Sequence, residues 1–317
     1  MILRPFVVGV LIVVALAPAV AGASPAEDWE RKFNAGLEAE GRGDLSEAER
    51  LLEAALADAE KLGQETVVVT TLNKLAMVER ARSEYAKAEQ HYRQGLSLVD
   101  RRFSSSVLVP TILNGLGTMY LAQGQYADAE PLLKRAVELE KGRFESSDPR
   151  RARSLYALAQ VYGAQGQFGR AEPLYQEAVR LLRDALGPQH REMAEALNDL
   201  ALRQMAQGKN EDAEKLYRQS VAILEKAVGP NHPEVAQALG SLAFILTAQN
   251  RMSEAEATYK RGLAILEKAY GPESCDVGRM LEGYTTMLRM ADREAEVAVT
   301  EARARAIRTA CGARAQR

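Results

Sequence analysis

The chain has 317 residues, of which 47% are hydrophobic and 26% are charged, values typical of a globular protein. Aromatic residues make up only 6%, while alanine and leucine are abundant, which favours helices over sheets. The formal net charge of -2 gives no reason to expect a nucleic-acid partner.

The first 23 residues have the pattern of a secretory signal peptide. Arg4 supplies a positive charge, residues 6–20 form an apolar run, and residues 21–23, Ala-Gly-Ala, form a small-x-small cleavage signal. The run is shorter than the roughly 20 residues of a spanning helix, and Pro18 interrupts its end. We therefore expect cleavage before Ser24, export to a periplasm or the outside, and no stable membrane span afterwards. An uncleaved anchor is the alternative.

Two sequence marks recur in step along the rest of the chain. The first is an Ala-Glu pair, which begins at positions 48, 88, 129, 171, 213, 255 and 295. The second is a leucine, at positions 72, 113, 155, 197, 239 and 281. Between a leucine and the next Ala-Glu lies a short turn such as AQGQY (122–126) or AQGKN (206–210). A fixed period of about 42 residues indicates a repeat architecture, here with seven repeats.

Each repeat has the pattern of two helices. In the third repeat, Leu113, Leu116 and Tyr120 share one helical face by their spacing of three and four residues. Gly124 then ends this helix, as glycine commonly does. A second apolar stripe of helical period follows from Ala129 onwards. We expect a helix-turn-helix hairpin in every repeat.

These features resemble the tetratricopeptide repeat, in the longer variety found in kinesin light chains and many bacterial proteins. Besides the small residue of the Ala-Glu mark, the matching marks are glycines in the turns and in the first helices: Gly124, Gly166, Gly208, Gly36 and Gly117. The resemblance covers residues 29–310 and implies an all-α fold, a right-handed α-solenoid of seven hairpins with the first helices lining a concave groove. We expect the solenoid to occupy residues 24–310, with the last repeat as a degenerate cap. A basic C-terminal tail, residues 311–317, follows it.

The linkers between the later repeats carry two of the three histidines. GPQH (187–190), GPNH (229–232) and GPES (271–274) occupy the same place in their repeats. A shared metal ion requires ligands about 2 Å from it, whereas packed helices lie 8–10 Å apart. We therefore interpret His190 and His232 as capping or packing residues and expect no metal site.

The predicted groove carries the candidate binding residues, read at helical steps around the leucine mark. They are Asn73, Arg80, Asn114, Tyr156, Gln160, Asn198 and Phe244. The three asparagines occupy one register, and amides can pair with the backbone of an extended peptide. The alternative is that they bond neighbouring helices and stabilise the stack. Gly240, Phe244 and Thr247 predict a more apolar end of the groove.

Cys275 and Cys311 flank the last hairpin, and antiparallel helices would bring them near each other. An exported chain permits a disulfide between them, and two free thiols are the alternative. The last helix is rich in arginine, including Arg303, Arg305 and Arg308. These cations suit a solvated helix end, and the alternative is a weak contact with an anionic partner or lipid surface.

The function predicted from these patterns is that of an exported scaffold which binds a peptide or protein partner in its groove. We expect no cofactor and no catalysis, because phosphate-binding loops, nucleophile elbows and metal-ligand motifs are missing from the sequence. The alternative is a structural subunit that bridges an envelope assembly through its convex face or its capping repeats. An enzyme is the third and weakest hypothesis.

Overall fold

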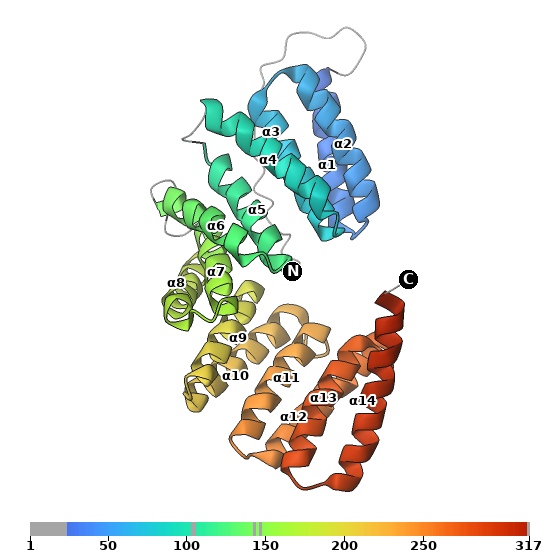
Figure 1. The fold of residues 1–317 in the computed structure, drawn as a ribbon. Coiled ribbons are helices and arrows are strands. Elements are labelled where there is room, and N and C mark those ends of the chain that lie inside the picture. Colours follow the sequence, from blue (N-terminus) through green and yellow to red (C-terminus); the bar gives the residue numbers. More distant parts are fainter. Residues whose placement is uncertain (1–23, 103–105, 142–143, 146–147, 316–317) are drawn as a thin grey trace. The chain divides into compact units, whose positions relative to one another are not determined.

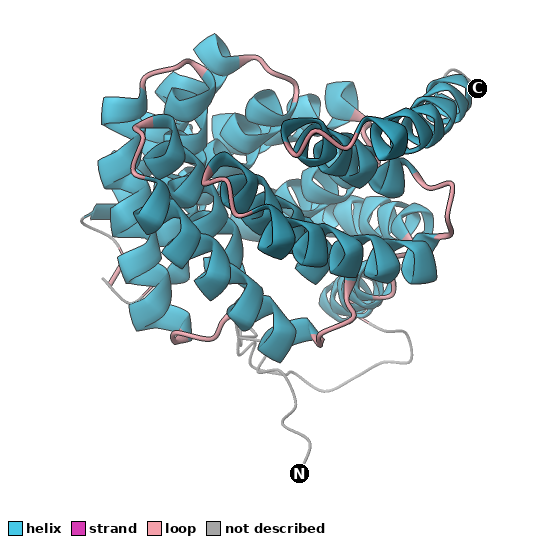
Figure 2. Ribbon diagram, turned by 90° about the horizontal axis from the view of Figure 1, so that it is seen from below, coloured by secondary structure: helices cyan, strands magenta, loops and turns pink. Residues whose placement is uncertain are grey.

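The computed structural model describes residues 24–102, 106–141, 144–145 and 148–315. The predicted signal peptide, residues 1–23, lies outside the described residues. Among those described, the regular structure is entirely helical (Figures 1 and 2). Contacts divide the chain into two compact units, with the boundary after Leu98. The prediction of one continuous solenoid over 24–310 stays a prediction, and each unit is described by itself.

Unit 1 contains the first two hairpins. Its helices are α1 (Pro25–Gly41), α2 (Leu45–Leu62), α3 (Glu65–Ala81) and α4 (Tyr85–Arg102). Leu52 of α2 and Leu75 of α3 are fully buried in its core. A Cβ on Gly36 would lie 2.9 Å from Leu52 Cγ, so a glycine in α1 permits the close approach of α2.

Unit 2 contains the remaining five hairpins. Its helices are α5 (Leu108–Ala122), α6 (Tyr126–Lys141), α7 (Pro149–Ala164), α8 (Phe168–Leu186), α9 (Arg191–Ala206), α10 (Asn210–Val228), α11 (Pro233–Ala248), α12 (Met252–Tyr270), α13 (Cys275–Met290) and α14 (Glu294–Ala315). The last repeat was expected to end at residue 310, before a basic tail, whereas α14 continues to Ala315. The described residues thus form the expected all-α hairpins, two in unit 1 and five in unit 2.

The first helices of unit 2 stack directly on one another. Contacts join α5 to α7, α7 to α9, α9 to α11 and α11 to α13. Within the described part of this unit, the second helices of successive hairpins make no comparable contact. Helices that are closer together lie on the inside of a curved stack, so the first helices line the concave face of unit 2.

Every hairpin turn contains one residue of positive φ at the same register. Four of them are glycines, as at Gly124 with φ +73°. In the other three turns the position is held by Ser83, Asn250 and Asp292, with φ values of 63°, 60° and 55°. The turn geometry is therefore kept even where the sequence lacks the residue that adopts it most easily.

The histidines of the linkers cap helices. His190 Nδ1 accepts a hydrogen bond of 3.3 Å from the backbone N–H of Glu192, at the start of α9. His232 Nδ1 accepts an equivalent bond of 3.3 Å from Glu234 at the start of α11. In the third copy of the linker, Ser274 caps α13 through Val277 N–H. Capping satisfies amide groups that a helix start leaves unpaired, and this agrees with the structural interpretation of the linker.

Ion pairs tie successive repeats of unit 2 together at a fixed step. Arg251, in the turn before α12, binds Glu214 of α10 at 2.7 Å, and Arg293, 42 residues later, binds Glu256 of α12 at 2.6 Å. Hydrogen bonds from Arg293 lower the pKa of Glu256 to about 2, so this carboxylate is ionised across the physiological range. Single exposed ion pairs stabilise little. Their value here is that they fix the same register in consecutive repeats.

The arginines of α14 are also held within the protein. Arg303 binds Glu267 at 2.7 Å, Arg305 lies 3.2 Å from Glu301, and Arg308 lies 2.9 Å from Glu282. These contacts favour the solvated helix end over a surface that binds an anionic partner.

Candidate functional site

A hollow lies on the concave face of unit 2, where α9, α11 and α13 pack side by side. Its volume is about 510 Å³. Tyr217 of α10 and Tyr259 of α12, both buried, reach it from the second helices. We call this hollow the α11 pocket. Residues that line it include Asp199, Leu202, Ser241, Phe244, Arg279 and Gly283.

Three of the residues that line the pocket are small, and neighbouring side chains pack closely against two of them. A Cβ on Gly240 would lie 3.2 Å from the Cε of Met280, and one on Gly283 would lie 2.9 Å from the hydroxyl of Tyr259. The residue that matches Gly283 in the preceding repeat is Ser241, and one repeat earlier it is Asp199. At this position of the repeat, the small residues of α11 and α13 are thus replaced by a carboxylate on α9.

Asp199 is held in place by three neutral donors. Tyr156 Oη donates to its Oδ2 at 3.0 Å and Gln160 Nε2 at 3.2 Å, both from α7. Tyr175 Oη of α8 donates to the same oxygen at 3.4 Å. The tyrosine rings pack edge to face, with centroids 5.7 Å apart. Two predicted groove residues, Tyr156 and Gln160, thus act together, and their shared partner is a residue that the sequence analysis did not name.

The tyrosines around Asp199 remain protonated donors. Burial, and secondly the negative charge of Asp199, raises the pKa of Tyr156 and of Tyr175 well above the ordinary value of 10. The same two causes raise the pKa of Tyr217 to about 12. A tyrosine with such a pKa keeps its proton at any physiological pH, so the network holds the carboxylate without adding charge.

The rest of the pocket combines apolar surface with unmet hydrogen bonding. Leu202 of α9 and Phe244 of α11 are 38% and 46% exposed, large values for such side chains. Asn198 also lines the pocket, and its Oδ1 is buried with no hydrogen-bond partner among the described residues. A buried polar atom without a partner costs free energy. A ligand that donates a hydrogen bond here would recover it.

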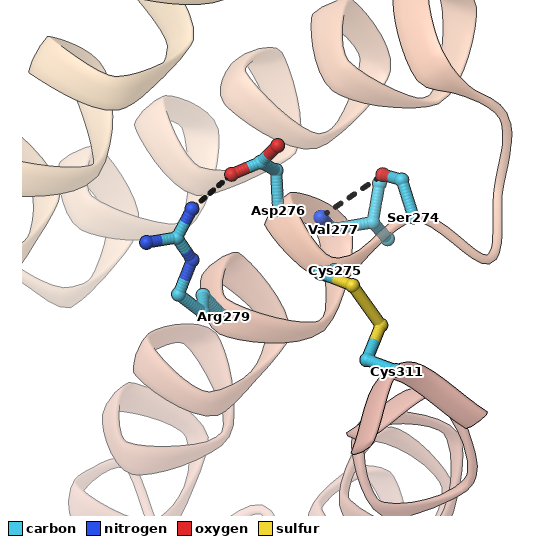
Figure 3. Close-up of a disulfide and its surroundings, with 6 residues drawn as sticks. All are labelled: Ser274, Cys275, Asp276, Val277, Arg279 and Cys311. Atoms are coloured by element: carbon cyan, nitrogen blue, oxygen red, sulfur yellow. Dashed lines mark hydrogen bonds and ion pairs between the residues drawn. A yellow bond between two sulfur atoms is a disulfide. The ribbon is translucent and has the colours of Figure 1, made fainter. Parts of the chain in front are cut away.

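The far wall of the pocket belongs to the terminal hairpin. Asp276 and Arg279, one turn apart on α13, form an ion pair (Figure 3). Directly before Asp276, Cys275 is joined by a disulfide to Cys311 of α14, with Cα atoms 5.9 Å apart. The pocket wall is thus covalently tied to the last helix.

Neither metal-binding clusters nor membrane-spanning helices are found in the described part of the chain. Its histidines, cysteines and acids form no group of three or more that could hold a metal ion. Helices of the length and apolarity needed to cross a membrane are also missing from those residues.

Comparison with known proteins assigns the family. The sequence profile of the tetratricopeptide repeat matches residues 34–101, 108–184, 170–226 and 192–268, more than half of the chain. The chain belongs to the tetratricopeptide repeat family. Proteins of this family are generally non-catalytic scaffolds for protein–protein interaction. No curated protein matches this sequence.

Solved structures show the same fold. A putative kinesin light chain from Podospora anserina with nearly identical repeats is 25% identical, with a TM-score of 0.55, and the match covers 64% of this chain and 96% of that one. BtubC from P. vanneervenii is 18% identical, with a TM-score of 0.60 over 76% and 92% of the two chains. PilF from Pseudomonas aeruginosa is 19% identical, with a TM-score of 0.56 over 80% and 97%. The likeness to kinesin light chains agrees with the long repeat period.

The three asparagines of this tetratricopeptide repeat protein share a register but not an environment. Asn198 lines the α11 pocket. Asn114 instead donates a 2.7 Å hydrogen bond to Ser154 and so ties α5 to α7. In unit 1, the amide nitrogen of Asn73 contacts Met77 Sδ at 3.8 Å within α3. One residue type therefore serves a helix contact in one repeat and faces a cavity in another.

Two more predicted residues lie away from the pocket. Arg80, like Asn73, belongs to unit 1, where it is half-buried near Tyr92. Thr247 was expected to contribute to the apolar end of the groove. It is instead buried and its hydroxyl donates to the backbone oxygen of Ala243 at 2.8 Å, so that expectation was wrong. Phe244 does line the pocket.

The tyrosines beneath the groove are the residues that the sequence reading missed. Tyr175, Tyr217 and Tyr259 each follow the alanine of an Ala-Glu mark by four residues. That spacing places them on the inner face of the second helix, facing the first helices. The signal was present in the repeat alignment, whereas the partner that each hydroxyl meets depends on the following repeat.

Proposed function

We propose that this protein is an exported, non-catalytic scaffold that binds a peptide segment of a partner protein in the α11 pocket. The observation that carries the proposal is the pocket itself, where the exposed side chains of Leu202 and Phe244 lie beside Asn198 and Asp199. Binding sites commonly combine an apolar hollow with a few polar groups that set orientation. The general role of the family supports the same class of function.

The test compares peptide binding by chains that differ only in the pocket. A random-peptide display library would be selected on residues 24–317, and the enriched peptides measured by fluorescence polarisation. Leu202→Ala with Phe244→Ala should weaken binding at least tenfold, because truncating the exposed apolar anchors costs 1.4 kcal/mol or more together. Tyr270→Ala is the matched control, since Tyr270 is 54% exposed and lies outside the pocket.

Either of two results would contradict the proposal. Equal affinity of all three proteins would move the site elsewhere and favour the bridging role through the convex face. Failure to enrich any peptide on a folded chain would refute peptide binding itself. Circular dichroism establishes that the variants are folded.

Export rests on the sequence pattern of residues 1–23, and one feature of α1 supports it. Ser24 caps this helix, accepting from Glu27 N–H at 3.3 Å, while its own N–H donates to Glu27 Oε2 at 2.7 Å. The residue that caps α1 is therefore the one that directly follows the expected cleavage point. Mass spectrometry of the protein from the native source should find Ser24 as the first residue. A first residue of Met1 would contradict cleavage.

A further inference from the structure

The charges that line the α11 pocket do not balance. Asp199, Asp276 and Arg279 are its ionisable acids and bases. Asp276 and Arg279 form an ion pair with each other. Asp199 forms no ion pair with any described residue. The pocket thus carries one uncompensated negative charge, at its α9 side.

Asp199 presents one free oxygen. Its three hydrogen bonds, from Tyr156, Gln160 and Tyr175, all reach Oδ2. Oδ1 has no hydrogen-bond partner among the described residues, and it is not one of the fully buried atoms. Three donors on one oxygen fix the orientation of the carboxylate. The other oxygen is left for a donor that comes from outside.

Two other acids near Asp199, unlike Asp199 itself, form ion pairs with arginines. Glu192, two turns before Asp199 on α9, pairs with Arg153 of α7 at 2.7 Å. Glu234 of α11 pairs with Arg191 at 2.5 Å. The stack therefore supplies an arginine to acids whose role is to join its helices, and supplies none to Asp199.

The nearest arginine along α9 forms no ion pair with Asp199. Arg203 lies one turn after Asp199. Its guanidinium is 5.1 Å from the ring centroid of Phe168 and near Gly163, and its charge acts on Tyr175 and Tyr217. On the other side, one turn before Asp199, Glu195 adds a second carboxylate with no ion pair among the described residues. Desolvation raises the pKa of Glu195, and the charge of Asp199 adds to that rise.

The repeat itself shows that the stack does not need this acid. Positions equivalent to Asp199 hold Ser241 and Gly283 in the next two repeats. Tyr217 and Tyr259, the equivalents of Tyr175, are buried there, and neither hydrogen-bonds to a carboxylate among the described residues. A carboxylate that appears in one repeat only, oriented by neutral donors and open to a cavity, has the properties of a ligand-binding group.

We propose that the α11 pocket accepts an arginine side chain of the partner segment on Asp199, with an adjacent apolar side chain against Leu202 and Phe244. This inference rests on the proposed function and names its ligand chemistry. A guanidinium carries five N–H donors and remains charged, so it can donate to Asp199 Oδ1 and neutralise the carboxylate. The exposed side chains of Leu202 and Phe244 would then contact the apolar residue next to the arginine in the partner segment.

The test uses defined probes. Fluorescein-labelled peptides of the form Gly-Leu-Arg-Phe-Gly would be compared with versions that carry lysine, citrulline or glutamate in place of the arginine. On residues 24–317 we expect the order arginine, lysine, citrulline, glutamate, with citrulline about tenfold weaker than arginine. Added salt should weaken the arginine peptide and leave the citrulline peptide unchanged.

The protein variants separate charge from structure. Asp199→Asn keeps a hydrogen-bond acceptor for the tyrosines and should abolish the preference for arginine over citrulline. Glu192→Gln is the matched control, since it neutralises a paired acid on the same helix, and it should keep the preference. Tyr156→Phe removes one donor but leaves the charge, and it should keep the preference as well.

The outcomes distinguish the two proposals. If citrulline and arginine peptides bind equally, or if Asp199→Asn keeps the preference, the arginine site is refuted while peptide binding stands. If none of the probes binds and the display library also yields no peptide, both proposals fail together. If Asp199→Asn does not fold, the citrulline peptide and the variants Tyr156→Phe and Glu192→Gln still test the arginine site. Both variants keep the charge of Asp199, so loss of the preference for arginine over citrulline in either of them would refute the site.

Discussion

Cys275 and Cys311 are separated by 36 positions in the sequence, and their disulfide joins the first turn of α13 to α14 near its end. The same first turn carries Asp276, and Arg279 follows within one turn. Both line the α11 pocket. The bond therefore closes the terminal hairpin into a covalent loop and holds one wall of the candidate site.

Loss of this disulfide should destabilise the terminal repeat. In the chain-entropy account, closing a loop of this size is worth roughly 3–4 kcal/mol. Cys311→Ser should lower the urea midpoint and increase hydrogen exchange in α14 first, because a terminal repeat contacts only one neighbour. Reduced wild-type protein should behave in the same way. Identical midpoints for the oxidised and reduced chains would show that the bond contributes nothing.

Glu140 should make the stability of the protein depend on pH. It is 2% exposed at the end of α6 and accepts a 2.8 Å hydrogen bond from Ser154, and burial raises its pKa to about 7. The pKa of Glu140 in the folded chain is higher than its unfolded value of about 4.5. The contribution of Glu140 to the free energy of unfolding is therefore complete below about pH 4.5. It is lost as the pH rises through about 7.

Glu140→Gln should remove that loss. At pH 8 we expect the variant to be more stable than the wild type by up to about 3 kcal/mol, with no gain at pH 4.5. Urea unfolding of both proteins between pH 4.5 and 8 measures the difference. A gain of the same size at every pH would mean that packing, and not ionisation, is responsible.

The turn residues of positive φ offer a second route to higher stability. Ser83→Gly should raise the free energy of unfolding by about 1 kcal/mol, because a left-handed conformation costs an ordinary side chain about that much. Asn250→Gly should gain less, since asparagine tolerates this conformation better. Chemical denaturation of the two variants checks the order. A loss of stability at Ser83 would show that its side chain, and not its backbone, matters at that turn.

Gly117 should not tolerate a side chain. A Cβ there would lie 2.6 Å from Cγ of Leu133, so Gly117→Ala should cost about 1–3 kcal/mol by overpacking α5 against α6. Adding Leu133→Ala should reduce the penalty of the first change, a coupling that a double-mutant cycle measures. Gly169→Ala is the control, since a Cβ at Gly169 meets no atom within 4 Å. Independent, additive effects of the two changes would contradict the close contact.

The periodic part of the fold was predictable because it depends on neighbours in the sequence. The period of the Ala-Glu mark predicted the hairpins, and the Gly-Pro segments with a following histidine predicted the linkers. The helix caps in those linkers form between residues close in the sequence. The site was less accessible. Tyr156 and Gln160 were named, but their common partner Asp199 comes from the next repeat. Thr247 is spaced along α11 like a groove residue, but its hydroxyl hydrogen-bonds to the backbone of the same helix.

The position of a residue in the repeat does not determine which partner its side chain contacts. Asn114 and Asn198 hold the same place in their repeats, yet only the first finds a hydroxyl, Ser154, within reach. The difference depends on the residue that the following repeat supplies at that point. Such pairings arise from side chains some 40 positions apart, which a single sequence does not connect.

The ion pair of Arg251 with Glu214 has a consequence for how such a chain changes length. Both partners fall within the 42-residue segment 210–251, and Arg293 with Glu256 reproduces the pair one segment later. A duplicated copy of the segment would contain its own arginine–glutamate ion pair. Because the copy spans one full repeat, its two ends would join the flanking repeats at the same repeat positions as before. Unequal recombination could thus lengthen the protein by whole hairpins without rewriting the junctions, leaving residues that occur once, such as Asp199, to mark a single place along it.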